Sequence, residues 1–207
     1  MQIESDFEFP LKIIVIGDSS VGKTNFIFRF VENRFSPNYV TTIGFDYRSK
    51  IITLPKVNKK VKLQIWDTAG QERYNSINKN LFQKVQGVII MYDITNRVSF
   101  ENIDKWLYLL SQNVANKAKI LVGNKLDLAD EKRIVEEEEG QKIADKNKMP
   151  FFETSSKTGD NVEKIFITLA EIIYENLSNE HSSMNDTGNV KVLKNQEPKK
   201  NKKSCCK

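Results

Sequence analysis

The chain has 207 residues, a length that suits one domain, or one domain followed by a tail. Hydrophobic residues make up 39% of it, enough for a core in a domain of this size, and no apolar run approaches the length of a membrane-spanning helix. The first ten residues include three acidic side chains and lack a basic start followed by an apolar stretch. They do not fit a secretory signal, so we expect a cytoplasmic protein.

The charge is unevenly distributed. Residues 191–207 hold seven Lys and one Glu, which gives this segment a net charge of +6. The whole chain has a net charge of +5, so residues 1–190 together carry −1. A nearly neutral globular part does not indicate a nucleic-acid-binding domain, whereas a basic tail suits anionic surfaces. The two cysteines, Cys205 and Cys206, are adjacent and make a poor structural disulfide, which favours a reducing compartment. With a single His, a His-based metal site is not expected.

Short apolar runs alternate with segments of helical periodicity along the chain. We expect strands over residues 11–16, 45–54, 61–66, 88–92, 120–122 and 150–152, and helices over residues 24–31, 100–110, 134–148 and 162–177. This alternation predicts an α/β fold with a mostly parallel six-stranded sheet and helices on both faces. The two strands joined by residues 55–60 are the expected antiparallel pair. After residue 177 the periodicity ends, and residues 178–207 are expected to be disordered.

The first expected strand is followed by GDSSVGKT, residues 17–24, which match the phosphate-loop pattern G-x-x-x-x-G-K-S/T between a strand and a helix. The glycines allow backbone N–H groups to point at phosphate oxygens, and the helix N-terminus adds a favourable dipole. In this pattern Lys23 lies on the β- and γ-phosphates and Thr24 ligates Mg²⁺. The full set of expected phosphate contacts in the loop is Ser20, Val21, Gly22, Lys23, Thr24 and Asn25. The loop by itself does not separate GTPases from ATPases or nucleotide kinases.

A second motif, IWDTAGQE at residues 65–72, lies at the end of the third expected strand. Asp67 could hold Mg²⁺ through water, as an acid at a strand end does in phosphate-loop enzymes. The Gly70 N–H could approach the γ-phosphate, because glycine lets the backbone come close, and the Gln71 amide could orient an attacking water. An isolated D-x-x-G is equally compatible with an ordinary turn. The complete string is more specific, and it predicts Gln71 as the catalytic residue.

Two later segments are expected to read a base. Asn124, Lys125 and Asp127 follow the strand at residues 120–122. The Asp127 carboxylate suits guanine, whose N1–H and N2 amino group are adjacent donors that adenine lacks. The Lys125 stem could lie on the base face, and Asn124 could link this loop to the phosphate loop. In the segment ETSSK, residues 153–157, backbone N–H groups could meet guanine O6, so the expected contacts also include Ser155, Ser156 and Lys157. Alone, N-K-x-D also occurs in ordinary charged turns.

In this order and spacing, these strings resemble the Ras superfamily and, within it, the Rab family, as do IGFDY at residues 43–47 and YDIT at residues 92–95. The resemblance covers about residues 9–177, with residues 1–8 as an N-terminal extension and residues 178–207 as a hypervariable tail. It implies a P-loop G domain that binds GTP or GDP with Mg²⁺ and hydrolyses GTP slowly. It also implies that Tyr39 and Thr42 belong to switch I, that Thr42 ligates Mg²⁺, and that Phe35 packs against guanine.

The resemblance further implies the partners of a Rab protein. These are an exchange factor, a GTPase-activating protein (GAP), a GDP-dissociation inhibitor or escort protein, and effectors. We expect a monomer that cycles to the cytosolic face of an intracellular membrane to regulate vesicle transport. Cys205 and Cys206 resemble a Rab prenylation site, beside lysines that could strengthen membrane attachment, although lysine runs are often only solvated. A Ras- or Rho-like signalling GTPase and a binding-only pseudo-GTPase are the alternatives. Ser156 stands where the family usually has Ala.

Overall fold

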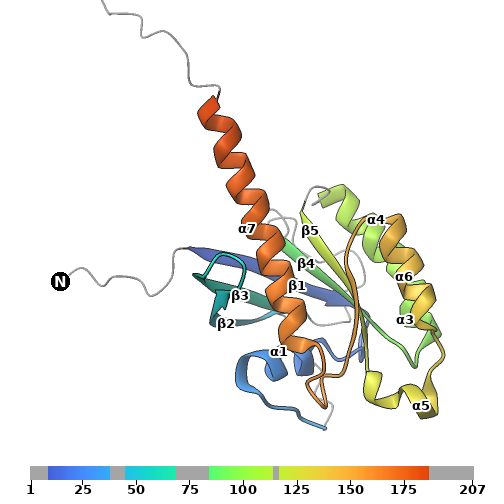
Figure 1. Cartoon of the computed structure of the whole chain (residues 1–207). Coiled ribbons are helices and arrows are strands. Elements are labelled where there is room, and N and C mark those ends of the chain that lie inside the picture. Colours follow the sequence, from blue (N-terminus) through green and yellow to red (C-terminus); the bar gives the residue numbers. More distant parts are fainter. Residues whose placement is uncertain (1–8, 38–44, 69–83, 114–116, 187–207) are drawn as a thin grey trace, which may run out of the picture.

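The computed structural model describes residues 9–37, 45–68, 84–113 and 117–186, which form one sheet with surrounding helices (Figure 1). In chain order the elements are β1 (Pro10–Gly17), α1 (Lys23–Glu32), β2 (Phe45–Leu54), β3 (Lys59–Thr68), β4 (Gly87–Asp93), α3 (Arg97–Glu101), α4 (Ile103–Asn113), β5 (Ala118–Asn124), the 3-10 helix η1 (Leu126–Leu128), α5 (Ala129–Lys132), α6 (Glu137–Lys146), β6 (Phe151–Thr154) and α7 (Val162–Asp186). This alternation of strands and helices confirms the expected α/β class.

The sheet has six strands in the order β2-β3-β1-β4-β5-β6. β1 pairs in parallel with β3 and β4, β4 with β5, and β5 with β6, whereas β2 runs antiparallel to β3. The prediction of a mostly parallel sheet with one antiparallel strand is therefore confirmed. Because five strands point the same way, their carboxyl ends meet at one edge, where ligands bind in open α/β sheets.

Side chains of β1 alternate between two buried cores, which explains why the strand is a nearly uninterrupted apolar run. Leu11, Ile13 and Val15 pack in the core under α1 and α7. Ile14 and Ile16 pack in the other core, under α3, α4 and α6. Figure 1 shows α7 lying across one face of the sheet, with α4 and α6 to the other side. Both faces are covered by helices, as expected.

Two of the predicted helices differ from the structure in the middle of the chain. The helix predicted over residues 100–110 is interrupted at Asn102, which separates α3 from α4. The helix predicted from residue 134 begins only at Glu137. The backbone N–H groups of Ile134 and Val135 donate instead to the Ile94 carbonyl, at 2.9 and 3.0 Å. These contacts hold the two residues against the end of β4, and the extended Glu136, whose N–H donates to Oε2 of Glu139 at 3.0 Å, caps the helix that follows.

The tail begins later than the sequence suggested. The expected disorder from residue 178 is wrong for residues 178–186, since α7 continues to Asp186 and extends past the sheet (Figure 1). Residues 178–186 contain no Gly or Pro, and adding residues to an existing helix costs little because the nucleus has already formed. Within the described residues, no helix is both long enough and apolar enough to span a membrane.

Candidate functional site

The loop between β1 and α1 has a backbone that requires glycine at two positions. Gly17 and Gly22 have φ of +144° and +96°. A Cβ on Gly17 would lie 2.1 Å from the Met91 carbonyl oxygen, and one on Gly22 would lie 2.4 Å from Nδ2 of Asn124. Ser20, which is exposed, also has a positive φ of 67°. The loop therefore has the curled backbone that lets successive N–H groups converge on an anion.

Lys23 places a cation inside this loop. It is the first residue of α1, and its side chain is buried. Its ammonium donates to the carbonyl oxygens of Gly17, at 2.7 Å, and Asp18, at 2.8 Å. A buried ammonium at a helix N-terminus is suited to polyphosphate, because both the charge and the helix dipole favour an anion there.

Thr24 and Asp67 meet beside the loop. The Thr24 hydroxyl donates to Oδ2 of Asp67 at 2.6 Å. Asp67 is buried at the end of β3, and its Oδ1 has no hydrogen-bond partner among the described residues. Burial raises the pKa of Asp67, whereas the Thr24 hydrogen bond and the Lys23 charge oppose that shift. A buried carboxylate oxygen without a donor, next to a hydroxyl, fits a magnesium site.

Asp127 lies in η1 at the same edge of the sheet and is positioned from the loop after β6. Its Oδ1 accepts a hydrogen bond of 2.6 Å from the Ser155 hydroxyl. The Ser155 oxygen in turn accepts the N–H groups of Lys157 and Thr158, at 3.2 and 3.1 Å. The Lys157 ammonium lies 3.7 Å from Oδ2 of Asp127. A carboxylate has about four lone-pair sites, so Asp127 retains capacity for donors of a ligand.

The Asn124 amide joins three segments of the site. Its Nδ2 donates to the Val21 carbonyl at 2.8 Å, so the predicted link between Asn124 and the phosphate loop is confirmed. Its Oδ1 accepts the Ser156 backbone N–H at 3.2 Å and the Ser156 hydroxyl at 3.0 Å. The hydroxyl bond depends on Ser156, because an Ala at this position would have no donor in its side chain.

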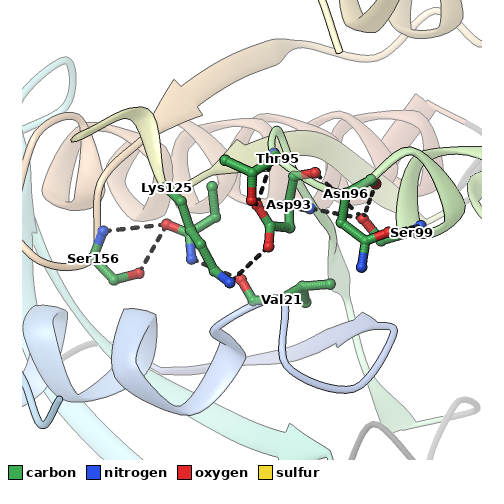
Figure 2. A network of polar contacts seen from close by, with 8 residues as sticks. Val21, Asp93, Thr95, Asn96, Ser99, Lys125 and Ser156 are labelled. Atoms are coloured by element: carbon green, nitrogen blue, oxygen red, sulfur yellow. Dashed lines mark hydrogen bonds and ion pairs between the residues drawn. The ribbon is translucent and has the colours of Figure 1, made fainter. Parts of the chain in front are cut away.

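Asp93 positions Lys125, a role that the sequence analysis missed. The Lys125 ammonium lies 2.6 Å from Oδ2 of Asp93, and Oδ1 of Asp93 accepts the backbone N–H and the hydroxyl of Thr95 at 2.9 and 2.7 Å (Figure 2). Asp93 and Asn124 are register partners on the adjacent strands β4 and β5, which explains the proximity. The one available signal was the position of Asp93 in the string YDIT.

Arg29 is a second residue that the sequence analysis missed. From α1 it donates to two backbone carbonyls of the loop after β6, through Nε to Ser156 at 3.0 Å and through Nη2 to Lys157 at 2.6 Å. It lies 127 residues from Ser156, and no local motif indicates the contact. Arg29 therefore links the helix that follows the phosphate loop to the segment expected to meet the base.

Other predicted site residues have different surroundings or lie outside the described residues. The Asn25 side chain exchanges two hydrogen bonds with the backbone of Ser36, at 2.9 and 3.1 Å, so it holds the segment that contains half-buried Phe35. Tyr39, Thr42, Gly70, Gln71, Cys205 and Cys206 lie outside the described residues. The roles expected for those six stay predictions.

Comparison with known proteins gives a consistent result over most of the chain. A family model described as "Ras family" matches residues 12–175. The Ras-related protein RABE1e of Arabidopsis thaliana is 38% identical over 98% of this chain and 94% of its own length. The Ras-related protein SEC4 of Candida albicans (strain WO-1) is 40% identical over 97% and 95%. The Ras-related protein Rab-10 of Diplobatis ommata is 44% identical over 82% and 84%.

Proposed function

Because the chain belongs to the Ras family and, within it, to the Rab small GTPases, which bind and hydrolyse GTP, we propose that it is a membrane-attached switch in vesicle transport. The observation that supports its nucleotide chemistry best is the network around Asn124. Through this amide the phosphate loop, the end of β5 and the loop after β6 are held together at one sheet edge. Such a network lets one ligand contact the phosphate-binding and base-reading segments at once.

Asp127 would select guanine over adenine. Its carboxylate is held in place by the Ser155 hydroxyl, so its remaining lone pairs have a defined direction for the paired N–H donors of guanine. The Lys125 stem, with its ammonium held by Asp93, would lie on the face of the base. The loop after β6 would lie beside guanine O6. Its N–H groups at Ser155, Ser156 and Lys157 donate to the Asp160 carbonyl, to Oδ1 of Asn124 and to the Ser155 hydroxyl, so contact with O6 would require one of these hydrogen bonds to be shared or exchanged.

The phosphates would be bound by the loop N–H groups from Ser20 to Asn25 and by the Lys23 ammonium, with Gly70 completing the γ-phosphate contacts. When bound, Mg²⁺ neutralises charge on the phosphate oxygens. Thr24 and Asp67 would hold it, joined by Thr42 according to the family resemblance.

Hydrolysis would depend on Gln71 orienting a water molecule. Intrinsic turnover should be slow, and a GAP that supplies an arginine would raise the rate by roughly 10³–10⁵-fold. An exchange factor, effectors and a GDP-dissociation inhibitor or escort protein complete the set of proposed protein partners. The basic tail with a prenylated Cys205 and Cys206 would attach the protein to the membrane, because one lipid chain alone binds only marginally.

Nucleotide competition tests the base assignment. The full-length protein is loaded with fluorescent GDP and challenged with GTP or ATP, beside Asp127→Ala and a control, Asp130→Ala, which alters an exposed carboxylate on neighbouring α5. We expect GTP alone to displace the label, Asp127→Ala to lose affinity by at least about tenfold, and the control to bind normally. Displacement by ATP at similar concentration would contradict guanine selection.

Imaging tests the membrane assignment. The full-length protein with an N-terminal tag is compared in cells with a variant in which Cys205 and Cys206 are both Ser. We expect the unaltered chain to mark a discrete internal membrane and the variant to be diffuse. If both are diffuse, the membrane-transport part of the proposal is wrong, while the GTP switch would stand.

A further inference from the structure

The phosphate loop has a second polar contact with the rest of the protein, nearer its start than the contact at Val21. The Asp18 carboxylate accepts Nδ2–H of Asn102 at 2.6 Å through one oxygen and Nε1–H of Trp106 at 2.9 Å through the other. Asn102 lies at the interruption between α3 and α4, and Trp106 lies one turn later on α4. We call this group of three residues the Asp18 contact.

The donors of the Asp18 contact are held in place by their own surroundings. Trp106 is 3% exposed and belongs to the core under α3, α4 and α6, so packing fixes its indole. The Lys105 ammonium donates to Oδ1 of Asn102 at 2.6 Å, which orients the amide so that its NH₂ group faces Asp18. Hydrogen bonds from well-ordered donors to a carboxylate are stronger than bonds between neutral groups.

The same residue contacts the interior of the loop through its backbone. The Asp18 carbonyl accepts the Lys23 ammonium at 2.8 Å. Asp18 therefore connects the α3–α4 junction to the cation proposed to bind phosphate. The nearby Ser20 has a positive φ of 67°, a conformation that is costly for a residue other than glycine and persists only when surrounding contacts impose it. The Asp18 contact supplies such a constraint at the start of the loop.

We propose that Asp18, Asn102 and Trp106 are positioning residues for guanine-nucleotide binding, which hold the phosphate loop in its binding shape and thereby slow the release of GDP. They act through the backbone N–H groups of the loop and not by touching the nucleotide. The inference rests on the proposed function, whose phosphate-binding arrangement it deepens. It also assigns the α3–α4 junction, which lies outside the motifs found in the sequence, a role in nucleotide retention.

Dissociation of fluorescent GDP from the full-length protein, chased with excess unlabelled GDP in the presence of Mg²⁺, tests the proposal. Trp106→Phe removes the indole donor and keeps an aromatic ring, and Asp18→Ala removes the shared acceptor. We expect dissociation to accelerate about threefold for Trp106→Phe and about tenfold for Asp18→Ala. Adding Trp106→Phe to Asp18→Ala should cause no further acceleration, because the two side chains act through one contact.

Leu110→Ala separates positioning from general stability. Leu110 is fully buried on α4, one turn beyond Trp106, and is apolar, so its truncation destabilises the same helix without removing a donor. We expect Leu110→Ala to lower the melting temperature at least as much as Trp106→Phe while GDP dissociates at the wild-type rate.

Each result has a distinct meaning. Rates within twofold of wild type for both Trp106→Phe and Asp18→Ala would overturn the inference, as would equal acceleration by Leu110→Ala. Should Asp18→Ala fold poorly, the comparison of Trp106→Phe with Leu110→Ala decides by itself. Failure of the unaltered protein to bind fluorescent GDP would instead contradict the proposed function.

Discussion

Replacing Asp93 by Asn isolates the ion pair that positions Lys125. The two charged groups are 2.6 Å apart, and the side chains of Asp93 and Lys125 are 7% and 33% exposed. The other oxygen of Asp93 accepts two hydrogen bonds from Thr95, and an amide oxygen of the variant can accept both. The substitution therefore removes the charge beneath Lys125 with little change in size and keeps the Thr95 contacts, while its NH₂ group replaces the acceptor that faces the ammonium.

The expected cost lies between two limits. Removing one partner of a fully buried ion pair costs about 3–5 kcal/mol, whereas an exposed pair contributes about 0–1 kcal/mol. Because a third of the Lys125 side chain is exposed, water can solvate the ammonium in the variant. We therefore expect Asp93→Asn to lower the free energy of unfolding by about 1–2 kcal/mol, or about 2–8 °C in melting temperature for a domain of this size.

Thermal unfolding and GDP dissociation measure the two consequences of the change. The Lys125 stem would no longer be held where it is proposed to lie on guanine, so GDP should dissociate about three- to tenfold faster. Glu175→Gln, which breaks an exposed contact with Lys56 of 3.2 Å, is the matched control and should leave both quantities unchanged. Wild-type stability and wild-type GDP release in Asp93→Asn would refute the assignment of Asp93 as the residue that positions Lys125.

Three further predictions concern stability. Ser20→Gly should raise the urea midpoint, because glycine adopts the positive φ of this exposed position without strain. The larger entropy of Gly in the unfolded state offsets part of this effect, so the net gain in the free energy of unfolding should be about 0.5 kcal/mol. A lower midpoint would contradict this. Tyr92→Phe should leave the free energy of unfolding unchanged or raise it by up to about 1 kcal/mol, because the buried hydroxyl has no hydrogen-bond partner among the described residues. A clear loss of stability in denaturant titration would show that the hydroxyl does have a hydrogen-bond partner. The hydrogen bond from Arg97 and, to a smaller extent, that from the Glu136 backbone N–H lower the pKa of Glu139 from 4.5 to about 2. A lowered carboxyl pKa stabilises the fold above its unfolded-state value, so the stability difference between wild type and Glu139→Gln should be constant above about pH 5 and shrink as pH falls toward 2. If the stability difference between wild type and Glu139→Gln does not change with pH in acid, the Arg97–Glu139 contact does not stabilise the fold.

The local chemistry of the chain was sufficient to predict the sheet and the phosphate loop. An apolar strand, a glycine-rich turn and a helix start are consecutive in residues 11–31, so short-range sterics and hydrophobic periodicity determine them together. The link from Asn124 to the loop was also predictable, because two motifs at the carboxyl ends of parallel strands must meet at the same edge.

Only the tertiary structure decided which side chains support those motifs. Asp18 and Trp106 are 88 residues apart, and Arg29 and Ser156 are 127 apart, so no pattern within a window of the sequence encodes either contact. The segment before α6 is likewise fixed by a distant group, since the Ile94 carbonyl accepts the N–H groups of Ile134 and Val135 and holds them outside the helix. Periodicity and turn chemistry act between neighbours in the chain, whereas these hydrogen bonds exist only once packing of the sheet and its helices has brought remote donors and acceptors within reach.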